Sequence, residues 1–132
     1  MFSERKKRMI QWFSKNEKRA VATIYSTNIT INKAGTEMMG YAYAAMVGLD
    51  KDDSKVAVQP IGLDEYEAKS YPEENMLLLS GGKAYTRISS TDFVARIGAF
   101  LGHDFKEKPR KYDCYFDQHE GLLIIDLKKE VA

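Results

Sequence analysis

Alternation of apolar and polar side chains runs through most of the chain beyond residue 20. In residues 20–25, Val, Thr and Tyr alternate with Ala and Ile, and residues 29–31 repeat the pattern after a Ser-Thr-Asn turn. Side chains of a strand point alternately to its two faces, so this spacing predicts two short strands joined as a hairpin.

A second pair of strands is predicted in the middle of the chain. Residues 41–49 and 55–60 are rich in apolar side chains, and the charged residues 50–54 between them are typical of a turn. Pro60 has no amide hydrogen to donate, so it predicts a strand end or a sheet edge.

Two hairpins are predicted in the last third of the chain. The first joins residues 76–79 to residues 83–89 through Gly81 and Gly82, because glycine accepts the positive φ of a tight turn. The second joins residues 111–116 to residues 122–127 through a polar, glycine-containing turn.

Helical spacing is confined to three segments. Asn32 predicts an N-cap for a short helix over residues 33–39 that Gly40 ends. Ser89, with Asp92 three residues later, predicts the start of a better helix, whose apolar face is followed by Gly102. Residues 4–19 predict a basic amphipathic helix, in which Met9, Trp12 and Phe13 form one apolar stripe.

The order of elements repeats along the chain. Residues 20–61 and residues 75–132 each read as strand, helix, strand, strand, joined by an acidic connecting loop over residues 62–74 and preceded by the helix of residues 1–19. The length of 132 residues suits a single domain. We therefore predict an α+β fold, a small β-barrel-like or mixed antiparallel sheet built from two β-α-β-β units with an N-terminal basic helix.

Residues 20–61 resemble the AbrB/MazE family of swapped-hairpin DNA-binding domains. The matching pieces are the strand after residue 20, the strand at residues 29–31, the helix after Asn32, Met39-Gly40 and the hairpin of residues 41–60. A repeat of this unit in the second half would make the chain similar to tandem, MraZ-type members. The family usually has proline at the position of Asn32 and arginines in the next helix, so the resemblance implies only Lys33 as a DNA contact.

Charge is distributed unevenly along the chain. Residues 1–28 hold seven Lys and Arg against two acids, whereas residues 29–82 hold four against nine. Cations that contact phosphates supply affinity for DNA. The candidate nucleic-acid-binding residues are therefore Arg5, Lys6, Lys7, Arg8, Lys15, Lys18, Arg19 and Lys33. The leading hypothesis is a small DNA-binding regulatory protein that contacts double-stranded DNA.

The acidic middle supports an alternative hypothesis. Asp50 to Asp53, Asp64 to Glu67 and Glu73-Glu74 could bind a basic protein partner, which would make the chain an antitoxin-like or host-interaction module. The oligomeric state is open as well. A homodimer is expected if only the first half adopts the family fold, whereas one chain completes the core if both halves do.

Candidate chemistry is sparse. His103 and His119 lack a metal-binding spacing, and the acids at residues 50–53 lack the glycine and glutamate of a calcium loop. Cys114 is the only cysteine and lies in a predicted strand, which favours a buried thiol. We predict no enzyme, cofactor or metal. The absence of an apolar leader or membrane span in the sequence predicts a cytoplasmic protein with no membrane partner.

Overall fold

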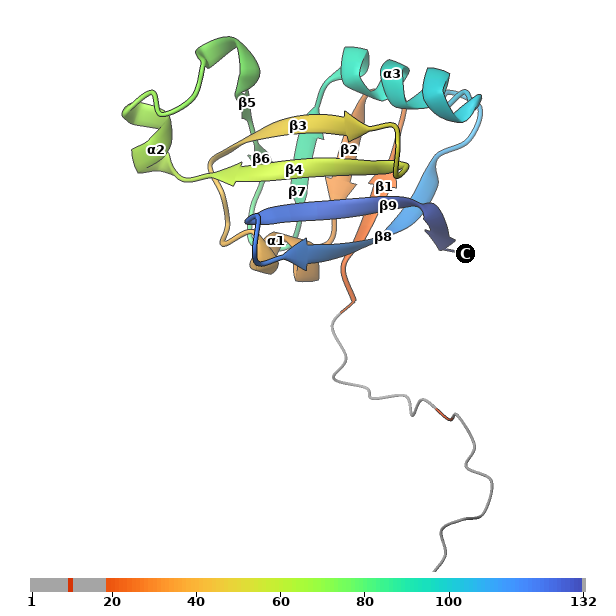
Figure 1. Ribbon diagram of the computed structural model, residues 1–132, viewed down its shortest axis with the longest axis horizontal. Coiled ribbons are helices and arrows are strands. Elements are labelled where there is room, and N and C mark those ends of the chain that lie inside the picture. Colours follow the sequence, from red (N-terminus) through yellow and green to blue (C-terminus); the bar gives the residue numbers. More distant parts are fainter. Residues whose placement is uncertain (1–9, 11–18, 132) are drawn as a thin grey trace, which may run out of the picture.

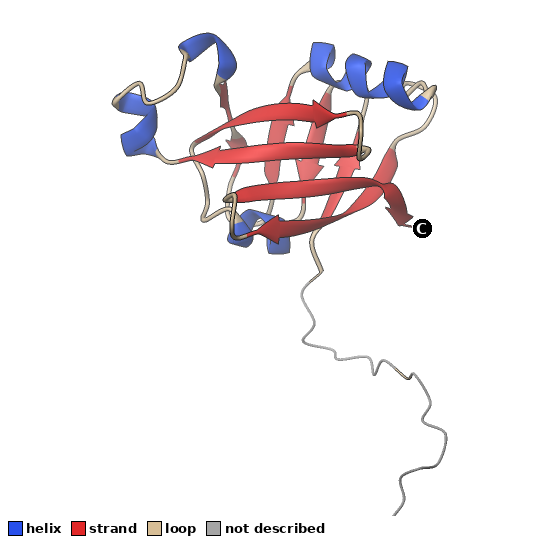
Figure 2. Ribbon diagram, in the orientation of Figure 1, coloured by secondary structure: helices blue, strands red, loops and turns tan. Residues whose placement is uncertain are grey.

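The computed structural model describes Ile10 and residues 19–131, and strands are the main regular structure in that part of the chain (Figures 1 and 2). The elements follow in the order β1 (Val21–Ile24), β2 (Asn28–Ile31), α1 (Lys33–Met38), β3 (Ala44–Asp50), β4 (Lys55–Ile61), α2 (Leu63–Glu67), the 3-10 helix η1 (Glu73–Asn75), β5 (Leu77–Leu78), β6 (Ser80–Gly81), β7 (Thr86–Ser89), α3 (Thr91–Leu101), β8 (Arg110–Asp117) and β9 (Leu122–Val131).

All nine strands belong to one antiparallel sheet with the order β5-β3-β4-β9-β8-β1-β2-β7-β6. The two strands at its ends, β5 and β6, are separated in the chain only by Leu79. The segment from Leu77 to Gly81 therefore connects the two edges of the sheet, and the sheet curls into a nearly closed barrel (Figure 1).

The strand pairs follow a two-fold pattern. Hairpin β3–β4 of the first half corresponds to hairpin β8–β9 of the second, and pair β1–β2 corresponds to pair β6–β7. The pairing of β1 with β8 corresponds in the same way to the pairing of β5 with β3. The two remaining pairings, β4 with β9 and β2 with β7, each join a strand of the first half to the equivalent strand of the second. The strands of the two halves are thus interleaved around one core.

The predicted α+β fold of two β-α-β-β units with an N-terminal basic helix is wrong. The structure is instead mostly one nearly closed antiparallel sheet of nine strands with few helices, in which strands of the two halves are interleaved. Helices α1 and α2 have only six and five residues, so strands bury most of the apolar surface. The expected helix over residues 4–19 lies outside the described residues except for Ile10 and Arg19, and neither of these two is helical.

The ends of the helices were predicted more accurately, from local signals. The Asn32 side chain accepts a hydrogen bond from the Gly35 amide at 3.2 Å, which confirms the predicted N-cap of α1. Helix α3 ends at Gly102 in the left-handed conformation, with φ +67°, also as predicted. Its N-cap is Ser90 rather than Ser89, because the Ser90 hydroxyl accepts from the Phe93 amide at 3.1 Å.

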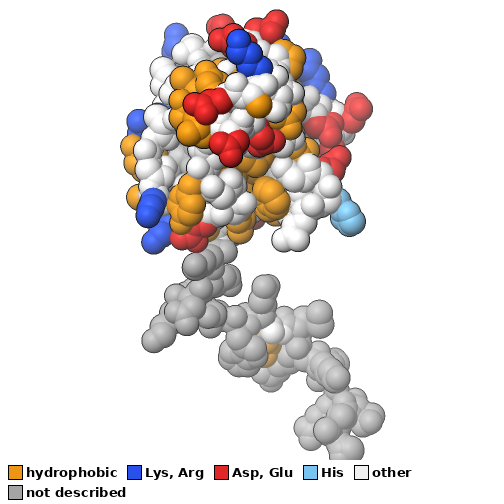
Figure 3. All heavy atoms as spheres, turned by 90° about the vertical axis from the view of Figure 1, so that its left-hand side faces the viewer, with side chains coloured by type: hydrophobic (Ala, Val, Ile, Leu, Met, Phe, Trp, Pro, Cys, Tyr) orange, Lys and Arg blue, Asp and Glu red, His pale blue; other side chains and the backbone are white. Residues whose placement is uncertain are grey.

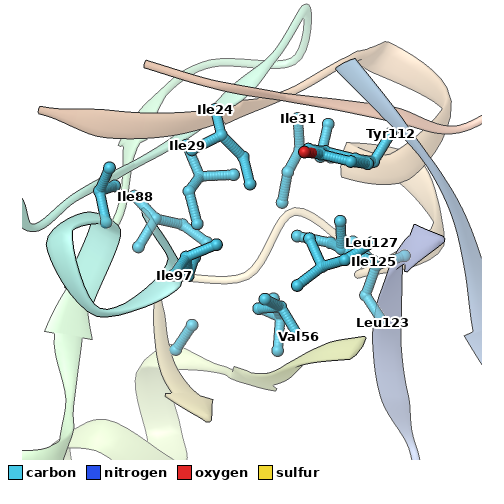
Figure 4. Close-up of a cluster of buried hydrophobic side chains, with 14 of the residues drawn as sticks. Ile24, Ile29, Ile31, Val56, Ile88, Ile97, Tyr112, Leu123, Ile125 and Leu127 are labelled. Carbon is cyan, nitrogen blue, oxygen red and sulfur yellow. The ribbon is translucent and has the colours of Figure 1, made fainter. Parts of the chain in front are cut away.

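The barrel interior is packed with aliphatic side chains from both halves (Figure 4). Ile24, Ile31, Val56, Ile97 and Ile125 are all fully buried in it. Figure 4 shows the hydroxyl end of Tyr112 pointing toward Ile31 in the same core. That hydroxyl has no hydrogen-bond partner among the described residues. Burial raises the pKa of Tyr112, and the nearby Arg110 offsets only part of the rise.

Replacement of Tyr112 by phenylalanine should therefore stabilise the fold. Removing a buried hydroxyl without a partner recovers its desolvation cost, so we expect the free energy of unfolding to rise by about 1 kcal/mol. Urea denaturation measures the change. Tyr115→Phe in the same strand is the control, because that hydroxyl is exposed and accepts a hydrogen bond from Lys55 at 2.9 Å. A loss of stability in Tyr112→Phe would show that the hydroxyl has a partner.

Candidate nucleic-acid interface

The outer face of strands β8, β1, β2 and β7 carries a row of cationic and hydroxyl side chains. In the strand register Lys111 lies opposite Thr23, Thr23 opposite Thr30, and Thr30 opposite Arg87. The neighbours of these residues, Ala22, Ile24, Ile29, Ile31 and Ile88, are buried in the barrel. Because side chains alternate along a strand, the four residues of the row point outward.

Further hydrogen-bonding groups flank this row. Tyr25 is 42% exposed at the end of β1, and the Thr30 hydroxyl donates to the Asn28 side chain at 2.7 Å. The Arg87 guanidinium lies 5.1 Å from the centre of the Tyr85 ring, which limits its orientations. A shallow depression of about 600 Å³ covers this part of the face. It is lined by Tyr25, Thr27, Asn28, Thr30, Arg87, Ser89, Ser90 and Thr91.

The basic N-terminal segment joins the folded domain at one end of this face. The Asn32 side chain donates to the carbonyl oxygen of Arg19 at 2.8 Å and accepts from the Val21 amide at 3.1 Å. One asparagine therefore caps α1 and also fixes the place where the segment enters β1. The exposed Lys33 follows Asn32 directly, so it lies beside this point.

One ion pair lies at the same end of the face. Arg19 Nη2 and Nε lie 2.7 and 2.8 Å from the same carboxylate oxygen of Asp113. In the part of β8 that pairs with β1, Asp113 is the only acidic residue among those described. Since the Arg19 side chain is 59% exposed, the pair is weakly held and its guanidinium is accessible to an anion.

The structure describes only two residues of the predicted set. Arg5, Lys6, Lys7, Arg8, Lys15 and Lys18 lie outside the described residues. Arg19 and Lys33 lie close to each other through Asn32. The sequence analysis missed Thr30, Arg87 and Lys111, which the register places in one row; their outward positions in alternating strands were the available signal.

Most acidic residues of the middle segment lie away from this face. Asp64, Glu65 and Glu67 belong to α2, and Glu73 and Glu74 to η1. Figure 3 views the side of the molecule where α2 lies and shows acidic side chains among apolar ones.

The β3–β4 turn is acidic as well, but cations neutralise part of its charge. Lys55 and Lys128 each lie 2.8 Å from a carboxylate oxygen of Asp53. Their hydrogen bonds lower the pKa of Asp53 to about 2, that of Lys128 contributing most.

Cys114 and His103 both have well-defined surroundings in the described part of the chain. Burial raises the pKa of the Cys114 thiol to about 12, which disfavours the nucleophilic thiolate. The His103 ring bonds the Lys108 carbonyl oxygen at 2.8 Å and packs against Phe105. Within the described residues no cluster of three or more His, Cys, Asp or Glu side chains is arranged to hold a metal ion.

Comparisons of the chain with protein families, curated proteins and solved structures find no match. The resemblance to the AbrB/MazE family therefore stays a prediction from the residues. Across the described part of the chain, every helix is too short or too polar to cross a membrane.

Proposed function

We propose that the protein is a small DNA-binding regulatory protein whose AbrB-like core contacts the phosphates of double-stranded DNA. The row formed by Lys111, Thr23, Thr30 and Arg87 is the observation that supports this function most directly. It combines two cations with the Thr23 hydroxyl on one face, and the basic N-terminal segment joins β1 at the end of that face.

The binding mode follows from the chemistry of these groups. Arg87 and Lys111 neutralise phosphates, while the Thr23 hydroxyl donates a hydrogen bond that fixes the position of the DNA backbone. Arg5, Lys6, Lys7, Arg8, Lys15, Lys18, Arg19 and Lys33 extend the cationic surface. Such contacts release counterions, so affinity falls steeply as salt rises.

A DNA titration at two ionic strengths tests the proposal. Each phosphate contact contributes about −0.9 to the slope of log K against log salt, so Arg87→Ala with Lys111→Ala should make the slope shallower by about 2. The alanine variant of residues 5–8 should lose a further part of the slope. Lys51→Ala with Lys69→Ala is the control, because these lysines follow β3 and α2 and lie outside the row.

Two results would contradict DNA binding. One is the absence of a complex at low salt. The other is a salt slope that stays unchanged in the Arg87, Lys111 and N-terminal variants.

The second candidate function is a non-enzymatic protein-interaction module with a basic partner. It is supported by the exposed tyrosines Tyr41 and Tyr43, which lie near the acidic helix α2. A stoichiometric basic partner recovered by the wild-type chain, but not by a variant of these tyrosines, together with no DNA complex, would favour this alternative.

A further inference from the structure

A second surface lies between the end of α1 and the start of α2. It is a groove of about 570 Å³, and its lining residues are Met39, Gly40, Tyr41, Ala42, Tyr43, Pro60, Gly62, Leu63, Glu65 and Leu79. We call it the tyrosine groove. Gly40 and Tyr41 both have a left-handed backbone, with φ +67° and +55°. A tyrosine is strained in this conformation, and such strain is common where a side chain is held for binding.

The apolar surface of the groove is open to solvent. Tyr41 is 51% exposed, Leu63 46% and Tyr43 42%. The ring of Tyr43 packs against that of Tyr66 with the centres 5.1 Å apart, so the two rings form a preformed aromatic wall. Aromatic rings left exposed side by side are typical of surfaces that bind another chain.

Helix α2 brings carboxylates to one side of this aromatic surface. Asp64 and Glu65 occupy the first turn of α2, and Glu67 follows in its last turn. The Glu65 carboxylate accepts a hydrogen bond from the Gly62 amide at 3.1 Å, which fixes its place on the lining of the groove. Tyrosine faces beside carboxylates attract lysine and arginine side chains by charge and by cation–π contact.

The chain itself contains a segment with the matching chemistry. Residues 1–18 hold six Lys and Arg against two acids, together with Met9, Trp12 and Phe13. This segment ends at Arg19, which Asn32 holds at the start of α1, whereas the groove begins at Met39, just after α1. Six helical residues span only about 9 Å, and eighteen extended residues reach about 60 Å, so the segment can cover the groove of its own chain.

We propose that the tyrosine groove binds the basic N-terminal segment of the same chain, with its cations at the α2 carboxylates and its apolar side chains on the tyrosines. The docking of the segment does not depend on the proposed DNA-binding function. Its consequence, that DNA competes with the groove for the same lysines and arginines, rests on the proposed function. The groove then acts as an internal competitor that weakens non-specific DNA contacts.

Trp12 is the only tryptophan of the chain and reports on docking directly. We expect acrylamide to quench the Trp12 fluorescence of the full-length chain severalfold less at low salt than at 0.5 M salt, in the absence of DNA. Two variants should remove this protection at low salt: Tyr41→Gly, which suits the left-handed backbone, and Asp64→Asn with Glu67→Gln, which removes two charges.

Matched controls separate docking from altered folding or net charge. Ser54 has the same left-handed φ of +54° in the β3–β4 turn, so Ser54→Gly repeats the backbone effect away from the groove. Asp52→Asn with Glu120→Gln repeats the change in charge in two other turns. Both controls should keep Trp12 protected.

Each other outcome would overturn the docking. Trp12 equally quenched in every variant shows that the segment is not bound, and protection that survives the groove variants places it elsewhere. Protection lost on dilution assigns the groove to the segment of a second copy. The DNA titration tests the competition independently, and the groove variants should bind DNA severalfold more tightly than the wild-type chain. If no variant binds DNA, the proposed function is wrong but the docking result is unaffected.

Discussion

Replacement of Gly81 by alanine is expected to lower the melting temperature by about 10 °C, the equivalent of about 2–4 kcal/mol for a domain of this size. Gly81 has φ +111°, where an L side chain is strained, and an added Cβ would clash with the carbonyl oxygen of Tyr85. The residue also belongs to the segment that connects the two edges of the sheet, where Ser80 and Gly81 pair with Arg87 and Thr86. The substitution therefore acts on barrel closure.

The adjacent glycine provides the control for this prediction. A Cβ at Gly82 would meet no heavy atom within 4 Å, and its φ is not positive in the strained range, so Gly82→Ala should change stability by less than about 1 kcal/mol. Thermal unfolding followed by circular dichroism measures both variants. Equal melting temperatures for the two would show that the conformation of Gly81 does not limit closure.

Turn and cap residues were predictable because their effect is local. Asn32 accepts from the Gly35 amide three residues later, and Gly102 takes the left-handed conformation that other residues avoid. Pro60 is another such case. It lies in β4 beyond the four residues that pair with β9, where its missing amide leaves no partner unsatisfied. In each case the residue type and its near neighbours determine the structure.

Strand pairing was not predictable, because alternation identifies the buried face of a strand but not its neighbours. The sequence predicted the hairpins β1–β2, β3–β4 and β8–β9, whose strands are joined by short turns. It did not predict that β4 pairs with β9, or that residues 77–81 divide between β5 and β6 at opposite ends of the sheet. These contacts form because the apolar faces of all the strands share one core.

The candidate interface likewise has one part that was predictable from the sequence and one part that depends on strand pairing. The excess of Lys and Arg over acids predicted DNA-binding residues within residues 1–28, where several cations are consecutive in the sequence. Arg87 and Lys111 are isolated cations in different predicted strands, and only the register through Thr23 and Thr30 brings them into one row. The acidic stretch was visible in the sequence, but its neighbourhood with Tyr41 and Tyr43 depends on how α1 and α2 flank β3.

Cys114 is expected to react with iodoacetamide about 50-fold more slowly in the native chain than in the urea-unfolded chain at pH 8. The pKa of its thiol rises from 9.0 to about 12, chiefly through burial and further through the nearby charge of Asp113. The thiolate is the reacting species, and below the pKa each further pKa unit lowers its fraction tenfold while making it about threefold more nucleophilic. Since the chain has one cysteine, the mass of the alkylated product follows this site alone.

The pH dependence distinguishes a raised pKa from simple steric protection. In the native chain the rate should keep rising tenfold per pH unit through pH 10, because the thiol there is still mostly protonated, whereas the unfolded chain should level off near pH 9. A native rate within tenfold of the unfolded rate at pH 8 would contradict the burial of Cys114. A slow native rate that levels off near pH 9 would assign the protection to access rather than to charge. In that second case the reaction passes through the opened chain, and Gly81→Ala should then react faster in proportion to its loss of stability.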